Sequence, residues 1–105
     1  MDIKLTLDPI AAKIHLQGRF DFASHHGFRE VCGKAFEHLA KEIQVDLAGV
    51  DYIDSAALGM LLILRDKCAV SARTLTLLRP SADVFSIFKI ANFAQLFDIR
   101  EVASR

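Results

Sequence analysis

A serine beside a carboxylate stands at the predicted start of an apolar helix. Asp54 and Ser55 follow an alternating apolar strand predicted at 43–47, and an uncharged apolar run occupies 56–64. A helix start collects unsatisfied N–H groups and a partial positive charge, so an anion is tolerated there. The Ser55 hydroxyl is therefore a helix N-cap, a phosphoryl acceptor, or both, since the two roles are compatible.

Three further carboxylates are candidates for the surroundings of this serine. Asp21 follows the second predicted strand, while Asp46 and Asp51 lie in or just after the third. If they gather with Asp54 at the same strand ends, they oppose a phosphate, which carries about −1.5 to −2 charges. The helix terminus offsets part of that repulsion. This arrangement predicts a phosphorylation switch of modest intrinsic cost.

The helix predicted from Ser55 to about Ser71 is apolar around more than half of its circumference. It is either enclosed in the core or leaves an apolar ridge beside Ser55 for a partner, because exposed apolar surface on a small domain usually marks a contact site. Met60 suits such a surface because its side chain adapts to its partner. Under the second interpretation, the partner contacts Ala56, Ala57, Met60 and Leu64, together with Asp21 and Asp54.

The sequence contains no motif for nucleophilic catalysis, for a nucleotide-binding glycine loop or for a zinc site. Asp54-Ser55-Ala56 lacks the glycines of a nucleophile elbow, and no phosphate-cradling glycine loop with Lys and Ser/Thr is present. The four histidines show no i,i+4 pair and no companion Cys or carboxylate set for zinc. We therefore expect neither an enzyme nor a bound cofactor or metal.

Composition and charge narrow the function further. The 105 residues are 52% hydrophobic and 25% charged, with 13 basic and 13 acidic side chains and no net charge. This balance argues against binding to nucleic acid or to a membrane surface. Cys32 and Cys68 are isolated and fall in predicted helices, which is typical of buried thiols in a reducing compartment. With no signal peptide and no apolar run near 20 residues, we expect a soluble cytoplasmic protein.

The periodicity predicts a single α/β domain over 1–105. Strands are expected at 3–7, from about 13 to Gly18, at 43–47, at 74–78 and at 97–99; helices are expected at 24–41, 55–71 and from Pro80-Ser81 to a cap at Asn92. The order is strand-strand-helix-strand-helix-strand-helix-strand. It predicts an antiparallel N-terminal strand on a mostly parallel central sheet with helices packed on it.

The segment from Asp46 to Gly59 resembles the signature of the STAS domain, the fold of bacterial anti-sigma factor antagonists. Gly18-Arg19-Phe20-Asp21 matches the Gly-x-x-Asp of that family, and the order of elements agrees over essentially the whole chain. The segments 62–66 and 92–97 are similar to single-domain members of partner-switching systems that control biofilm and flagellar genes.

The resemblance implies that Ser55 is the phosphorylation site. It implies binding to an anti-sigma factor when Ser55 is unphosphorylated, a serine kinase (the anti-sigma factor itself or a separate one) and a PP2C-type phosphatase. Nothing in the sequence demands more than a monomer, so we expect the free protein to be monomeric. Asp21 and Asp54 would position the hydroxyl or the kinase's magnesium. Many members carry Ser or Thr and then Gly where this chain has Ala56 and Ala57, which leaves Ser55 as the single acceptor.

Two other interpretations stay open. Small STAS proteins also serve as non-switching subunits of lipid-transport or larger signalling assemblies, in which Ser55 would be only a cap and the apolar helix a permanent interface. A small-ligand or nucleotide sensor is the third interpretation, although no phosphate loop or cofactor motif supports it.

Overall fold

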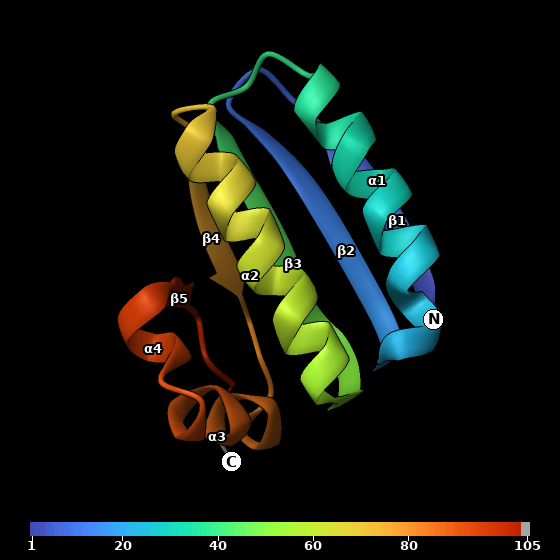
Figure 1. The fold of residues 1–105 in the computed structure, drawn as a ribbon, viewed down its shortest axis with the longest axis vertical. Helices are drawn as coiled ribbons and strands as arrows, with labels where there is room; N and C mark the ends of the chain where they lie inside the picture. Colours follow the sequence, from blue (N-terminus) through green and yellow to red (C-terminus); the bar gives the residue numbers. More distant parts are fainter. Residues whose placement is uncertain (104–105) are drawn as a thin grey trace.

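A computed structural model describes residues 1–103, which form a five-stranded sheet with helices on one side (Figure 1). The strands are β1 (Asp2–Leu7), β2 (Ala11–Phe20), β3 (Glu42–Ile53), β4 (Thr74–Leu78) and β5 (Asp98–Arg100); the helices are the short 3-10 turn η1 (Phe22–Ser24), α1 (His25–Glu37), α2 (Ser55–Val70), α3 (Ala82–Ile90) and α4 (Phe93–Leu96). The α/β class and the order of the longer elements agree with the sequence prediction. The turn η1 and the one-turn helix α4 are additions to it.

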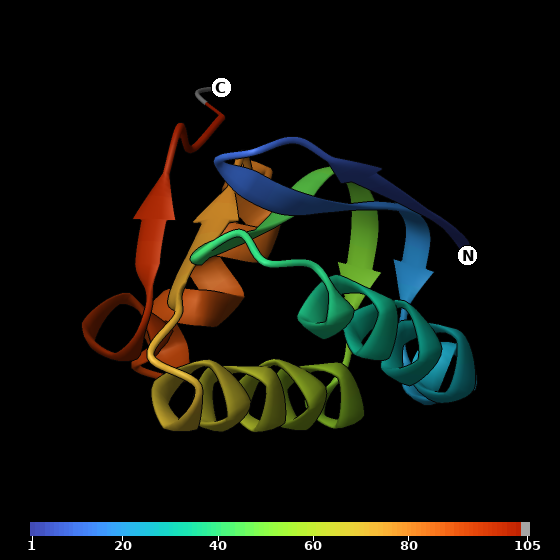
Figure 2. The same ribbon diagram turned by 90° about the horizontal axis from the view of Figure 1, so that it is seen from above.

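The strands follow one another across the sheet in chain order, with β1 antiparallel to β2 and all later neighbours parallel. The predicted antiparallel start and mostly parallel sheet are confirmed. A parallel connection is right-handed, so an order that never reverses brings the connecting helices to one face. Figure 2 shows α1 and α2 side by side on the same side of the sheet.

The core lies between the sheet and these helices. Alternate residues of β2 and β3 point into it, and α1, α2 and α3 contribute their apolar faces. Ile14, Ile43, Leu61 and Phe88 are fully buried, and burying an aliphatic or aromatic side chain of this size contributes roughly 1.5–3 kcal/mol. Within residues 1–103, no helix is long and apolar enough to cross a membrane.

The central strands are longer than their apolar pattern predicts. β2 runs past Gly18 to Phe20, and β3 runs through Gly49 to Ile53, where the sequence had indicated a strand end and a turn. The pairing of β2 with β3 shifts register near these glycines. Gly18 has φ +103°, and a Cβ on Gly49 would lie 3.0 Å from the Leu16 carbonyl oxygen. Gly18 and Gly49 therefore mark an irregularity within the β2–β3 pair, and not the ends of these strands.

The opposite face of the sheet carries polar side chains, and a chain of contacts crosses it from β1 to the end of β4. Thr6 Oγ1 lies 3.1 Å from His15 Nε2, and His15 Nδ1 lies 3.2 Å from Asp46 Oδ2. Arg79 pairs with the same carboxylate, and the Ala48 N–H donates to Asp46 Oδ1 at 3.1 Å. Asp46 is buried beneath these partners.

These contacts predict an acid-sensitive contribution to stability. Burial alone raises the pKa of Asp46, but the hydrogen bonds from Arg79 and the Ala48 amide, with the Arg79 charge, outweigh it and hold the pKa below its usual value. The unfolded chain then binds a proton more readily than the folded one. Asp46 therefore makes its full contribution to the free energy of unfolding above its pKa in the unfolded chain, about 3.9. This contribution is lost as the pH falls through its lower pKa in the folded chain.

We expect the stability difference between the wild type and Asp46→Asn to shrink as the pH falls from 6 toward 3, as measured by urea unfolding at each pH. Asp51→Asn is the matched control, because it removes an exposed carboxylate from the same strand. A difference for Asp46→Asn that is constant over this range would contradict the assignment.

Candidate functional site

The candidate site is formed where β2 and β3 end. Phe20 and Ile53 are paired in the parallel ladder, so the next residues, Asp21 and Asp54, emerge side by side at the same sheet edge. The Asp54 N–H donates to the Phe20 carbonyl oxygen at 3.3 Å and extends the pairing by one step. The first residue of α2, Ser55, follows at once. The two carboxylates and the serine are therefore brought together, as expected.

The Asp54 side chain forms hydrogen bonds with two elements, α2 and η1. Its Oδ1 accepts the Ala57 N–H at 2.9 Å and so caps α2, while its Oδ2 accepts the Phe22 N–H at 3.2 Å from η1. Both carboxylate oxygens are thus held by backbone amides. This arrangement fixes the start of α2 against the end of β2.

Ser55 itself is not the cap of the helix, and the prediction that its side chain fills this role is wrong. The structure places it at the first helical position with an exposed side chain. Asp54, which has extended backbone angles and directly precedes the helix, caps it instead by accepting the Ala57 N–H. Within residues 1–103 the Ser55 hydroxyl makes no hydrogen bond. The amides of Ser55 and Ala56 also have no acceptor, since the first bond of the helix is Leu58 N–H to the Asp54 carbonyl oxygen.

Asp21 lies in a partly neutralised setting. Arg19 Nε is 3.6 Å from Asp21 Oδ2, and the Arg19 guanidinium stacks 3.9 Å from the centre of the Tyr52 ring on the adjacent strand. Ser24, the buried last residue of η1, donates its hydroxyl to the Arg19 carbonyl oxygen at 3.1 Å. Arg19 and Tyr52 were not predicted as site residues, and their register positions on β2 and β3 are the signal that places them together.

The other candidate carboxylates do not complete a cluster around the serine. Asp46 pairs opposite Leu78 of β4 and faces the polar side of the sheet, where Arg79 and His15 hold it. Asp46 does not gather at the site, because β3 continues for seven residues beyond it. Asp51 is exposed on β3.

The predicted contact ridge on α2 also needs correction. Ala57, Met60 and Leu64 are buried against the core, and Ala56 is half-buried. The exposed large apolar residues of α2 are Leu62, Ile63 and Val70, with Ile63 59% exposed. Asp66 marks the solvent side of this helix, and counting back three and four residues from it leads to Ile63 and Leu62. That charge was the sequence signal for the exposed pair.

Comparison with known proteins identifies the family. Residues 3–100 match the family model described as "Mlab, STAS domain". A STAS-domain containing protein of Pseudomonas aeruginosa strain UCBPP-PA14 is 44% identical over 89 residues, covering 82% of this chain and 84% of that protein. The chain therefore belongs to the STAS domain family.

Solved structures share the fold. The anti-sigma factor antagonist SpoIIAA in its unphosphorylated form matches with a TM-score of 0.73 and 18% identity, covering 97% of this chain and 90% of that one. An anti-sigma factor antagonist from Mycobacterium paratuberculosis matches with a TM-score of 0.84 and 11% identity, covering 96% and 86%. SpoIIAA has also been solved in a phosphorylated form, which matches with a TM-score of 0.69 and 19% identity, covering 95% and 92%.

The geometry predicts unequal losses of stability for two neighbouring substitutions. Asp54→Ala removes the cap of α2 and the bond to η1 and is expected to lower the free energy of unfolding by about 1–2 kcal/mol. Ser55→Ala removes a hydroxyl without a partner and is expected to change it by less than about 0.5 kcal/mol. Urea unfolding followed by circular dichroism measures both values.

Asp51→Ala is the control for loss of an exposed carboxylate on the adjoining strand. A loss from Ser55→Ala as large as that from Asp54→Ala would show that the hydroxyl, and not the carboxylate, caps the helix.

Proposed function

We propose that this chain is an anti-sigma factor antagonist that binds its partner while Ser55 is unphosphorylated and releases it when Ser55 is phosphorylated. The observation that carries this proposal is the free, exposed hydroxyl of Ser55 at the first position of α2, with Asp54 performing the structural work of the cap. The serine can be modified without breaking any contact of the fold. Membership of the STAS family and the fold shared with anti-sigma factor antagonists support it.

The start of α2 is suited to carry a phosphoryl group without unfolding. The unbonded amides of Ser55 and Ala56 and the positive end of the helix dipole attract a phosphate. Asp54 repels it, but this carboxylate is held by two amides, and Arg19 lies beside Asp21. The attraction and repulsion largely offset each other. The switch therefore acts on the partner contact and not on the fold.

A phosphoryl group on Ser55 would weaken the binding of a partner that covers this residue. A protein that covers Ser55 would enclose a doubly charged phosphate beside the fixed Asp54 carboxylate, and an enclosed charge without a counter-charge is strongly unfavourable. A thousandfold loss of affinity corresponds to about 4 kcal/mol, which one such charge can supply. Asp21 and Asp54, side by side at the strand ends, are suited to orient the hydroxyl or a kinase-bound magnesium ion in the docked complex.

A serine kinase and a PP2C-type phosphatase complete the proposed cycle in the cytoplasm, acting on a monomeric domain that spans residues 1–105. The chain then serves as a regulated binding protein of a transcription system and not as an enzyme.

Variants at position 55 test the proposal by isothermal titration against each purified anti-sigma factor of the source organism. We expect one of these proteins to bind the wild type and Ser55→Ala with similar affinity. Binding of Ser55→Asp to that protein should be at least about tenfold weaker, because a fixed charge lies in the contact.

Ser86→Asp is the control, since it places the same charge on the exposed surface of α3. Equal binding of Ser55→Ala and Ser55→Asp would favour a non-switching subunit. Absence of binding to every anti-sigma factor would contradict the antagonist function itself.

A further inference from the structure

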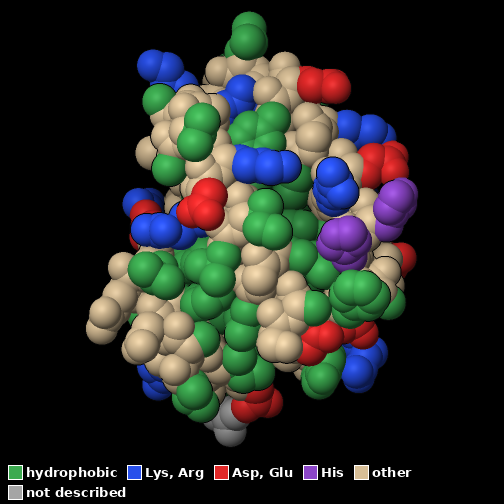
Figure 3. Space-filling model, viewed as in Figure 1, with side chains coloured by type: hydrophobic (Ala, Val, Ile, Leu, Met, Phe, Trp, Pro, Cys, Tyr) green, Lys and Arg blue, Asp and Glu red, His purple; other side chains and the backbone are tan. Residues whose placement is uncertain are grey.

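A half-open hollow of about 240 Å³ lies between α1 and α2, where hydrophobic side chains gather on the face seen in Figure 3. Its volume lies between the roughly 150 Å³ of a cavity that takes one benzene and the roughly 300 Å³ at which small-molecule sites begin. It therefore suits one bulky apolar group. The apolar lining consists of Phe28, Cys32, Met60, Ile63 and Leu64, and the polar lining of His25, Arg29 and Lys67.

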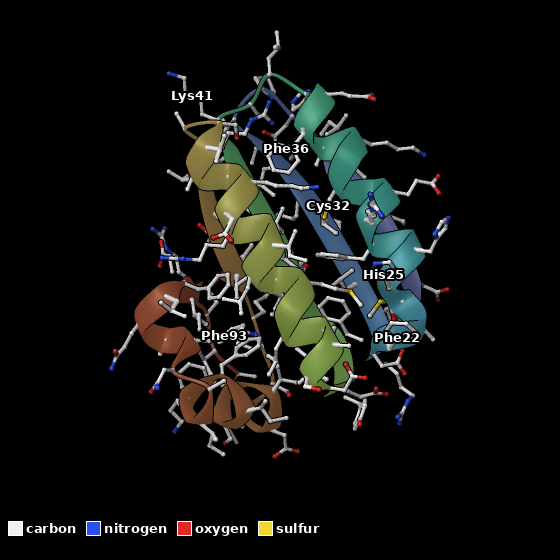
Figure 4. The ribbon with its side chains drawn as sticks, viewed as in Figure 1. Phe22, His25, Cys32, Phe36, Lys41 and Phe93 are labelled. Carbon is white, nitrogen blue, oxygen red and sulfur yellow. The ribbon has the colours of Figure 1, made fainter. Side chains whose placement is uncertain are left out.

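A second, shallower hollow continues from the first along the same two helices. It is lined by Gly33, Phe36, Asp66, Lys67 and Val70, so Lys67 borders both. Gly33 leaves the α1 side of this hollow open, because no atom beyond its chain neighbours and the backbone of its own helix lies within 4 Å of the position that its Cβ would take. Figure 4 shows Cys32 and Phe36 pointing into the space between the helices. The two hollows together are called the α1–α2 groove below.

The edges of the groove carry apolar side chains in solvent. Ile63 is 59% exposed and Val70 is 90% exposed. A small molecule in the first hollow would leave Val70 uncovered, whereas a helix laid along the groove would cover both residues. Exposed apolar residues that border a groove are typical of the helix-in-groove mode of binding.

The free charges at the groove are positive. Within residues 1–103, neither Arg29 nor Lys67 has an ion-pair partner, whereas Asp66 lies 4.0 Å from the Arg65 guanidinium. On α1, Lys34 is paired with Glu30 at 3.7 Å. The rim therefore attracts acidic side chains, and charge complementarity of this kind selects one partner over another.

The floor of the first hollow stays uncharged. Burial raises the pKa of the Cys32 thiol to about 12, so the thiol stays protonated near neutral pH and acts as a small apolar surface. An apolar floor below a basic rim suits a bulky apolar side chain with acidic neighbours.

We propose that the α1–α2 groove binds an amphipathic helix of a partner protein, with one bulky apolar side chain in the first hollow and acidic residues against Arg29 and Lys67. This inference goes beyond the switch at Ser55. Lys67 lies about 18 Å from Ser55 along α2, which exceeds the screening length of about 10 Å at 0.1 M salt. The contact of Lys67 with an acidic residue is therefore screened from the charge at position 55.

Two synthetic amphipathic helices of about 15 residues provide the probe, sharing one Leu/Phe face and differing only in Glu or Lys at the flanking positions. They are titrated into the full chain and followed by amide chemical shifts. The Glu peptide is expected to shift amides of α1 and α2 and to bind about tenfold more tightly than the Lys peptide. The Arg29→Glu/Lys67→Glu variant should reverse that preference, and Ser55→Asp should leave it unchanged.

Ile63→Ser should weaken binding of the Glu peptide, whereas Ile10→Ser, which removes the same side chain from the exposed β1–β2 loop, should not. Equal binding of both peptides, or of neither, would overturn the proposal. Saturating shifts of the same amides by decanoate would also overturn it, because they assign the groove to a small amphiphile. Shifts of the free protein that depend on its concentration would overturn it as well, because they assign the groove to a second copy of this chain. Each of these outcomes leaves the proposed switch at Ser55 untouched.

Discussion

The parallel pairing of β2 with β3 is the constraint on which the site depends. It carries the chain ends of both strands to one edge and sets Asp21 beside Asp54. Asp54 then joins three elements, because its amide extends the pairing with β2 while its two side-chain oxygens hold η1 and α2. One carboxylate thus orients the helix start from which the serine is presented. The fold needs nothing from the serine hydroxyl, and that independence leaves the hydroxyl available for modification.

The order of the strands gives the two faces of the molecule different roles. Because the parallel strands follow chain order without reversal, α1 and α2 share one face and form both the cover of the core and a groove between themselves. The bare face is held by polar contacts that centre on Asp46. The domain thereby keeps three features apart: the candidate site at the strand ends, the groove between the helices and the polar face of the sheet.

Much of the fold was predictable from the sequence because its local patterns agree with its tertiary structure. The strand at 74–78 and the boundaries of α2 follow directly from periodicity and from the Asp54-Ser55 start. Asn92 ends α3 in the left-handed conformation, with φ 62°, as its position indicated. Gly18 and Gly49 were misinterpreted as strand ends, since a positive φ or a close approach of the backbone also requires glycine inside a strand.

The site was predictable in part. Adjacency of Asp21 and Asp54 follows from parallel strands alone, but which side chain caps α2 depends on the residue at which the helical backbone begins, and only the structure gives that residue. The apolar residues of α2 could not be divided into core and surface by hydrophobicity, because both faces are apolar. One charge on the solvent side, Asp66, carried that information.

The central claim is that Ser55 is the modified residue of this domain. Intact-protein and peptide mass spectrometry of the chain purified from its source cells tests it most directly. Two other exposed serines, Ser71 and Ser86, serve as internal comparators, and the hydroxyls of both are bonded to backbone carbonyl oxygens. The account predicts a single phosphate on Ser55 that varies with growth condition. A phosphate on Ser71 or Ser86 with Ser55 unmodified, or no phosphate under any growth condition, would contradict it.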